Sequence, residues 1–147
     1  MANGRNSGKR SAIDRDQGRF VALPFSVIDS VAYKNLSHPA RSLLIEIDRQ
    51  YCFDNNGRLL ASYAYLRKRG WTSADTITRA KRELLAAGLI HETVKGCRPN
   101  KASWYAVTWR PIDRLQGYDE GALQTFVRSA YAKTQGLDRL SVKVDSR

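Results

Sequence analysis

Apolar residues recur at helical spacing through the segment TSADTITRAKRELLAAG, from Thr72 to Gly88. At about 100° per residue, one side of such a helix carries Ile77, Ala80 and Leu84. The opposite side carries Asp75, Arg79, Arg82 and Ala86. Thr72 and Ser73 suit an N-cap and Gly88 suits a stop, so the pattern predicts a helix over about 74–87. Its inner face is apolar and its outer face bears two arginines.

Two further helices are predicted upstream. Ser37-His38-Pro39 begins a helix that runs to about Cys52, with Ser37 as its cap and Pro39 in its first turn. Its expected buried stripe consists of Ala40, Leu43, Leu44, Ile47 and Tyr51. After a polar loop at 53–58 and a short strand at 59–61, Ser62 caps a helix from Tyr63 to about Arg69.

The packing of the short helix follows from its apolar residues. Tyr63 and Leu66 are expected to pack inward, and Gly70 ends the helix. Trp71 is expected to fill the turn between the two helices as a core residue. Another helix is expected over 27–33, with Val27, Ile28 and Val31 facing the core.

The region after Gly88 changes to strand-like composition. Residues 89–95 and 102–109 are two β-rich runs, and the segment GCRPNK between them favours a turn. The pattern therefore predicts a β-hairpin with a basic tip. In the second strand Tyr105, Val107 and Trp109 share one face, and Trp104, Ala106 and Thr108 share the other. One of these faces must belong to the core.

The two ends of the chain are expected to lie outside a central domain at 21–110. Residues 1–20 are polar and basic without apolar periodicity, which predicts a disordered arm. Such an arm either follows phosphates or enters a minor groove, or it is an inert leader. Residues 111–147 are expected to form a helical extension and tail. A helix over 118–133 would have an apolar face of Leu123, Phe126, Val127, Ala130 and Tyr131. Packing on the domain is favoured over a partner surface, because this face would be prone to association if exposed.

Positive charge is distributed unevenly along the chain, whose 147 residues carry a formal net charge of +11 and fit one domain with appended ends. Residues 26–60 contain four basic and four acidic residues, whereas residues 62–82 contain six basic residues and one acidic residue. Residues 94–110 add four basic residues and no acidic one. A solvated charged face is the plain alternative, but this segregation favours a polyanion partner.

Groups suited to catalysis or metal binding are scattered. His38, His91, Cys52 and Cys97 are isolated from one another, and phosphate-binding glycine motifs and a nucleophile elbow are absent. We therefore expect no enzyme activity, no metal and no cofactor. No stretch has the apolar length of a signal peptide or a membrane span. The expected location is cytoplasmic, at the bacterial nucleoid when DNA is bound, with no membrane partner.

The order of helix, helix and hairpin resembles the winged helix-turn-helix families of bacterial regulators and of plasmid and phage replication initiators. The resemblance covers 36–109 and includes the Gly-Leu-Ile at 88–90. It implies an α+β fold, a three-helix core with a C-terminal β-hairpin wing, here followed by a C-terminal helix. Residues 22–44 and 96–109 also resemble small helix-turn-helix proteins of bacterial prophages and integrating elements, which implies an origin in a mobile element.

Carried over by position, the resemblance implies a DNA interface on the second helix of the motif and on the wing. The implied base-reading residues are Ser73, Asp75, Thr76, Thr78, Arg79 and Arg82. The wing residues Lys95, Arg98 and Lys101 are implied to meet phosphate or a minor groove, and Arg67 and Lys68, at the end of the preceding helix, are further implied DNA-binding residues. The chain lacks an obvious long dimerisation helix, so a homodimer stays open as an arrangement on DNA.

The sequence thus predicts a sequence-specific double-stranded DNA-binding protein that acts in transcriptional regulation or replication initiation of a bacterial mobile element. Two other hypotheses stay open. One is a protein-binding inhibitor or adaptor of a host complex, for example a phage-encoded anti-defence protein, built on the same fold. The other is a single-strand nucleic-acid binder that stacks bases on Trp104, Tyr105 and Trp109, which requires Trp104 to be exposed.

Overall fold

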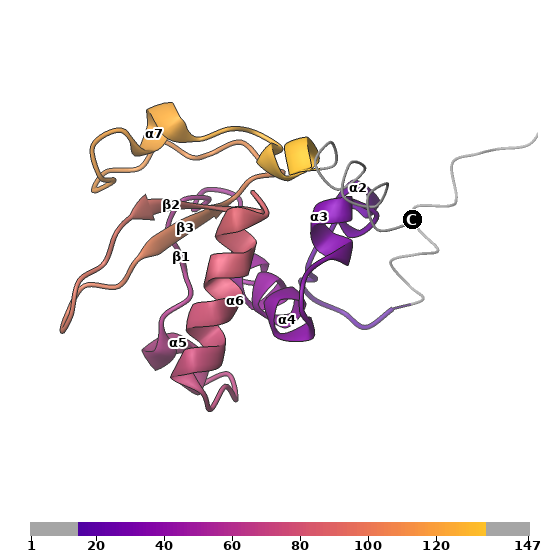
Figure 1. Ribbon diagram of the computed structural model, residues 1–147, viewed down its shortest axis with the longest axis horizontal. Helices are drawn as coiled ribbons and strands as arrows, with labels where there is room; N and C mark the ends of the chain where they lie inside the picture. The colour runs from indigo at the N-terminus through magenta and orange to yellow at the C-terminus, as the bar shows by residue number, and fades with distance from the viewer. Residues whose placement is uncertain (1–14, 135–147) are drawn as a thin grey trace, which may run out of the picture.

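The computed structural model describes residues 15–134 and has an α+β architecture (Figure 1). Two short helices, α2 (Phe25–Ile28) and α3 (Val31–Lys34), precede the longer α4 (His38–Asp48). The order then continues through β1 (Leu59–Leu60), α5 (Tyr63–Arg67), α6 (Ala74–Ala86), β2 (Ile90–Val94) and β3 (Trp104–Val107). The last elements are α7 (Ala122–Thr125) and a 3₁₀ helix, η1 (Ala130–Thr134).

The three strands form one antiparallel sheet in the order β1-β3-β2. Strands β2 and β3 make the predicted hairpin, in which Ile90 pairs with Val107 and Glu92 with Tyr105. The register shifts between Glu92 and Val94, which leaves Thr93 as an extra residue of β2. The hairpin projects from the body of the molecule, and its tip lies at the lower left of Figure 1.

The core lies between α4, α6 and one face of the sheet. Helix α4 contributes Leu43, Leu44 and Ile47, all fully buried. Helix α6 contributes Ile77, Ala80 and Leu84, which confirms its predicted inner face. The predicted stripe of α4 is confirmed except at Tyr51, which lies beyond the end of the helix and is half-buried. Burial of such a continuous apolar face supplies most of the stability of short helices.

Helix α5 departs from expectation at Tyr63. Leu66 is fully buried as predicted, and the half-buried Trp71 packs against the core. Tyr63, in contrast, is 42% exposed, so the prediction that it packs inward is wrong. Its hydroxyl lies 3.5 Å from the carbonyl oxygen of Thr72, beyond the end of α5. The helix has five residues and buries only Leu66. The neighbouring Tyr65, partly buried, packs against the core instead of Tyr63.

The helix predicted over 27–33 is two helices. Ser30 has an extended backbone and ends the first helix, because its Oγ donates to the carbonyl of Val27 at 2.6 Å. The same oxygen accepts the N–H of Tyr33 at 3.2 Å and so caps α3. Val27 and Ala32 are buried at this break. A serine that serves as both stop and start explains why a continuous helix was the wrong prediction.

Residues 111–134 do not form the predicted helix over 118–133. The segment contains only the four-residue α7 and then η1, separated by extended backbone at Phe126. Its backbone groups bond to the hairpin instead: Asp119 N–H donates to the carbonyl of Thr93 at 2.9 Å and Ser129 N–H to that of Thr108 at 2.7 Å. The N–H of Ser129 would serve a helix over 118–133, and its bond to the carbonyl of Thr108 removes it from such a helix, which is a physical reason for the difference.

The same segment packs on the domain. Figure 1 shows it passing along the side of the sheet with α7 next to β2. Tyr131 is buried in the main core, and Ala122 is buried beside β2. Both faces of β3 are therefore buried, since Ala106 is as inaccessible as Val107. Residues 1–14 of the predicted arm and 135–147 of the predicted tail lie outside the described residues.

The part of the chain that the structure describes can be searched for membrane-spanning helices and for metal sites. No helix there combines the length and the apolar character needed to cross a membrane. Within the same residues no group of three or more His, Cys, Asp or Glu side chains is placed to hold a metal ion. His91 has a structural setting, with its Nε2 2.9 Å from the carbonyl of Ala122 and its ring edge-on to Phe126.

Candidate nucleic-acid interface

The outer face of α6 carries the two predicted arginines. Asp75 and Arg79 form an ion pair at 3.0 Å, and their side chains are 78% and 68% exposed. An exposed pair one turn apart contributes only about 0–1 kcal/mol, so Arg79 is released for another partner at little cost. Arg82 is exposed one turn further on and has no ion pair among the described residues. The two guanidinium groups are thus available on one helix face.

The predicted hydroxyl residues of α6 have roles within the helix. Ser73 is the N-cap, and its Oγ accepts the N–H of Thr76 at 3.2 Å. Thr78 Oγ1 donates to the carbonyl of Ala74 at 3.0 Å, on the exposed side. Thr76 is half-buried and lies in a second groove with His38 and Trp71, beside α4. The structure therefore places Thr78 on the flank of α6 that faces the hairpin and Thr76 on the opposite flank, beside α4.

The residues before α6 are also basic. Arg67 is the last residue of α5, Lys68 is its C-cap, and both side chains are exposed. Arg69, the next residue, forms an ion pair at 2.9 Å with Glu46 of α4, which raises the pKa of Arg69. Arg69 thereby fixes the turn between α5 and α6 to α4. Arg67 and Lys68 have no ion pair within the described residues and stay available.

The tip of the hairpin is a tight turn held by backbone bonds. Cys97 N–H donates to the carbonyl of Lys101 at 2.9 Å, and Lys101 N–H donates back to that of Cys97 at 3.0 Å. Gly96 donates to Ser103 Oγ at 2.9 Å and runs so close to the opposite strand that an added Cβ would lie 2.3 Å from the carbonyl oxygen of Lys101. Arg98 and Lys101 are both exposed on this fixed turn.

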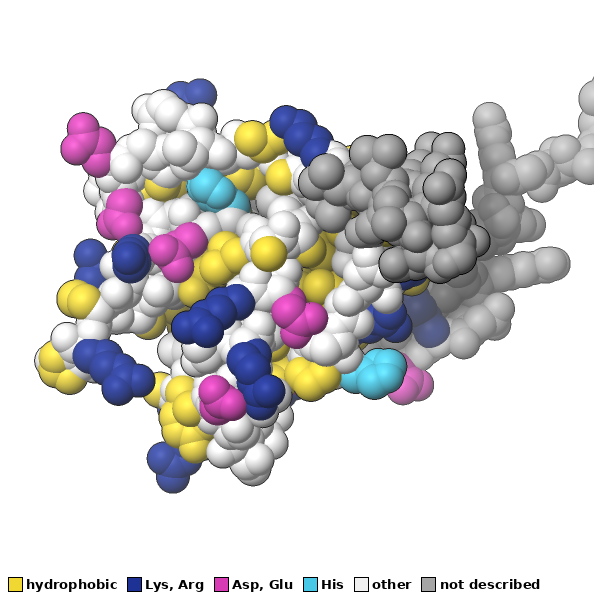
Figure 2. All heavy atoms as spheres, in the orientation of Figure 1, with side chains coloured by type: hydrophobic (Ala, Val, Ile, Leu, Met, Phe, Trp, Pro, Cys, Tyr) yellow, Lys and Arg dark blue, Asp and Glu magenta, His cyan; other side chains and the backbone are white. Residues whose placement is uncertain are grey.

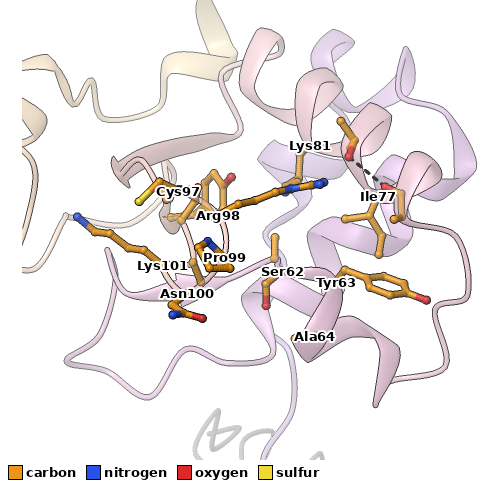
Figure 3. Close-up of a pocket in the computed structure, with 17 residues that line it drawn as sticks. Ser62, Tyr63, Ala64, Ile77, Lys81, Cys97, Arg98, Pro99, Asn100 and Lys101 are labelled. Atoms are coloured by element: carbon orange, nitrogen blue, oxygen red, sulfur yellow. Dashed lines mark hydrogen bonds between the residues drawn. The ribbon is translucent and has the colours of Figure 1, made fainter.

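A groove of about 540 Å³ separates the hairpin tip from α6 (Figure 3). Its walls are the first residues of α5, one flank of α6, and the hairpin turn at 96–103. The side chains of Lys81 and Arg98 extend into the same space between α6 and the hairpin. Tyr105 lies at the groove, and burial raises the pKa of its hydroxyl to about 12, so it stays neutral.

Lys81 is the residue of this groove that the sequence did not predict. It is half-buried, and burial lowers the pKa of its ammonium group, an effect that Glu92 partly opposes. On a helical wheel Lys81 stands next to the apolar face and away from Arg79, so the outward pattern of charges does not include it. The sequence signal that could have identified Lys81 is a cation at the edge of the apolar face of the helix, followed along the chain by a basic hairpin.

Lys95 differs from the other predicted hairpin cations. Its N–H donates to the carboxylate of Asp119 at 2.6 Å, and it does not line the groove. The side chain is exposed at the base of the tip, beside an acidic residue of the segment that covers the sheet. The structure thus groups Arg98, Lys101 and Lys81 around the groove and places Lys95 at its margin.

The surface over these elements is mainly basic. In Figure 2 lysine and arginine side chains lie over α6 and around the hairpin, with a few acidic side chains among them. One of the acids of α6, Glu83, is engaged in the fold, because its carboxylate accepts the N–H of Ser37 at 3.0 Å and the Ser37 hydroxyl at 2.5 Å. The cations therefore exceed the acids that remain free on this surface.

Trp104, the residue on which a single-strand site at the sheet would depend, is half-buried. The guanidinium of Arg58 lies 4.9 Å from the centre of its ring. A Cβ on Gly117 would lie 3.3 Å from the ring, so the segment that covers the sheet runs directly against it. Tyr105 and Trp109 are buried. These rings do not offer open faces on which bases stack.

Comparisons of the chain with protein-family models, with curated proteins and with solved structures find no match in any of the three.

Proposed function

We propose that this protein is a winged-helix protein that binds double-stranded DNA, with α6 in the major groove and the β2–β3 hairpin as the wing. The order α4, β1, α5, α6, β2, β3 and the sheet order β1-β3-β2 support this assignment. Helix α6 has 13 residues, about 20 Å of length, and an exposed outer face, which suits a groove about 12 Å wide.

The observation that carries the proposal is the placement of two kinds of cation on two neighbouring elements, the outer face of α6 and the hairpin turn across the groove from it. Arg79 and Arg82 stand on the outer face of α6, where guanidinium groups suit the paired acceptors of guanine. Arg98 and Lys101 stand on the hydrogen-bonded hairpin turn across the groove from α6, where they suit backbone phosphates. In this arrangement the helix reads sequence and the hairpin contributes affinity that does not depend on sequence.

The proposed task is transcriptional regulation or replication initiation for a bacterial mobile element, with the protein in the cytoplasm. Both tasks need a protein that selects one site among many, so sequence preference is the property to test first. The absence of preference at physiological salt would instead favour the adaptor hypothesis, in which the same surface binds a host protein complex.

The test is selection of bound duplexes from a random DNA library at 150 mM salt, followed by sequencing. The expected result is a defined motif for the wild type and a blurred motif for Arg79→Ala. Arg114→Ala is the matched control, because Arg114 is an exposed arginine outside α6 and the hairpin, and its motif should be unchanged. If no motif is enriched, or if both variants change it alike, the proposal is wrong. A motif with two-fold symmetry would also show that a homodimer binds.

A further inference from the structure

A second cavity, of about 650 Å³, shares no residue with the groove beside α6. It lies between the extended residues 18–22 on one side and the end of α4 with the following turn on the other. Its lining residues after the extended stretch are Asp48, Arg49, Tyr51, Phe53 and Arg110. The volume is in the range of pockets that hold a compact ligand.

Two phenylalanine side chains stand open to solvent at this cavity. Phe20 is 68% exposed and Phe53 is 81% exposed, although rings of this size usually bury most of their area. The ring of Tyr51 lies 5.6 Å from that of Phe53 at an angle of 58°. The guanidinium of Arg15 lies 4.3 Å from the ring centre of Phe20. The cavity therefore offers aromatic surface on Phe20 and Phe53 that the fold covers only in part.

The turn that presents Phe53 is a built structure. Phe53 has a φ of 75°, a backbone conformation that bulky residues rarely adopt. Asn55 holds the turn, because its Oδ1 accepts the N–H of Cys52 at 2.8 Å and its Nδ2 donates to the carbonyl of Gln50 at 2.9 Å. Backbone strain that is held by specific hydrogen bonds often occurs at binding sites. Here the strained turn presents the large ring of Phe53 to solvent.

The same cavity is rich in arginine. Arg110 forms an ion pair with the buried Asp48, donates to the carbonyl of Ala22 at 3.2 Å, and lies 4.1 Å from the ring centre of Tyr51. Asp48 is the sole carboxylate among the lining residues, and Arg110 neutralises it.

Two other lining arginines therefore leave the cavity positively charged. Arg19 bonds to the carbonyl of Tyr51, which joins the extended stretch to the turn. Arg49 is exposed and has no ion pair within residues 15–134. Its guanidinium group is available to an anion.

We propose that this cavity binds unpaired nucleotides of a single-stranded nucleic acid, with bases stacked on Phe20 and Phe53 and phosphates beside Arg49 and Arg19. Aromatic faces stack on any base, and adjacent guanidinium groups follow the phosphate chain, which is the usual composition of a single-strand site. A base within a duplex is stacked between its neighbours and offers no free face to such a ring, so the ligand differs from the duplex proposed for α6. The proposal uses none of the residues of the duplex interface and stands or falls independently of it.

The test is fluorescence anisotropy of the full chain with labelled oligothymidylate and oligouridylate of 12 nucleotides at 150 mM salt. Phe53→Ala is expected to weaken the binding of the oligomer about tenfold. Phe25→Ala is the matched control, because Phe25 is 80% exposed but does not line the cavity, and it should leave binding unchanged. Arg49→Gln should reduce the salt slope by about 0.7, the value for one single-strand phosphate contact.

Phe53→Leu guards against a folding effect, since it keeps an apolar side chain beside Tyr51 and loses only the ring. It should weaken binding while thermal unfolding stays unchanged. The proposal is overturned if the wild type binds neither oligomer at protein concentrations up to about 100 μM, a weak single-strand affinity. Equal effects of Phe53→Ala and Phe25→Ala would overturn it too. Duplex binding by Phe53→Ala should equal that of the wild type, which separates this result from a failure of the duplex interface.

Discussion

Asn56 forms two hydrogen bonds with the backbone of Val107, one in each direction. Its Nδ2 donates to the carbonyl of Val107 at 3.1 Å, and its Oδ1 accepts the N–H of Val107 at 2.8 Å. The side chain thus takes the place of a strand residue next to β3, just before β1 begins. Nδ2 also donates to the carbonyl of Pro111 at 2.8 Å, and Asn56 is fully buried. This residue joins the loop before β1, the last strand and the segment that follows it.

Replacement of Asn56 by alanine should lower the free energy of unfolding by about 3 kcal/mol, because buried backbone groups of Val107 and Pro111 lose their partners. Urea unfolding followed by circular dichroism measures this change. Asn100→Ala is the matched control, since Asn100 is exposed at the hairpin tip and its loss should change stability by less than about 0.5 kcal/mol. Similar midpoints for the two variants would show that the Asn56 network is dispensable.

Gly88 is the contact point between the end of α6 and the C-terminal segment. It has a φ of +71°, and a Cβ there would lie 2.8 Å from the carbonyl carbon of Ala130. Gly88→Ala should therefore cost about 1–3 kcal/mol for the clash in addition to backbone strain. Gly70 has a φ of +94°, and a Cβ there would meet no atom within 4 Å, so Gly70→Ala isolates the strain, about 1 kcal/mol. Equal losses in urea unfolding would mean that η1 does not press on Gly88.

The elements that the sequence predicts well are those with local signals. Helix α6 combines a cap, a period of 3.6 residues and a glycine stop within one segment, and the hairpin combines two β-rich runs with a turn. The C-terminal segment lacks such a signal, since its apolar residues fit a helix as well as an extended path. What decides its path is the pair of hairpin carbonyls that accept its N–H groups, those of Thr93 and Thr108.

Part of the candidate interface depends on tertiary contacts in the same way. The outward arginines of α6 follow from the helical wheel alone, whereas the place of Lys81 depends on the hairpin that folds back beside it. The position of Thr76 depends on α4, and that of Lys95 on Asp119. The exposure of Phe53 depends on a turn stabilised by Asn55. No periodicity in the sequence contains these relationships.

The proposed separation of roles between α6 and the hairpin predicts two different effects on DNA binding. Arg82→Ala should cost about 1–3 kcal/mol on the preferred duplex and relax its sequence preference, whereas Lys101→Ala should weaken all duplexes alike. Lys101→Ala should also reduce the slope of log affinity against log salt by about 0.9. Fluorescence anisotropy from 50 to 300 mM salt, with the selected duplex and a scrambled one, measures both quantities. Identical behaviour of the two variants would refute the assignment of separate roles.

The charge of Lys81 should lower the stability of the fold and raise the affinity for DNA. Burial lowers its pKa in the folded protein below the ordinary value of 10.5, so between those two values the unfolded chain holds more protons than the folded one. Stability from this group therefore rises as the pH increases through that interval, and at neutral pH the buried charge is a net cost. Lys81→Met keeps an unbranched side chain of nearly the same length and removes the charge. It should unfold at a higher urea concentration than the wild type at pH 7, and the difference should shrink toward pH 10.5.

The affinity of Lys81→Met for duplex DNA should fall, because the groove beside Arg98 loses a cation that suits a phosphate. If Lys81→Met binds DNA as tightly as the wild type, Lys81 is not part of the interface, whatever the change in stability.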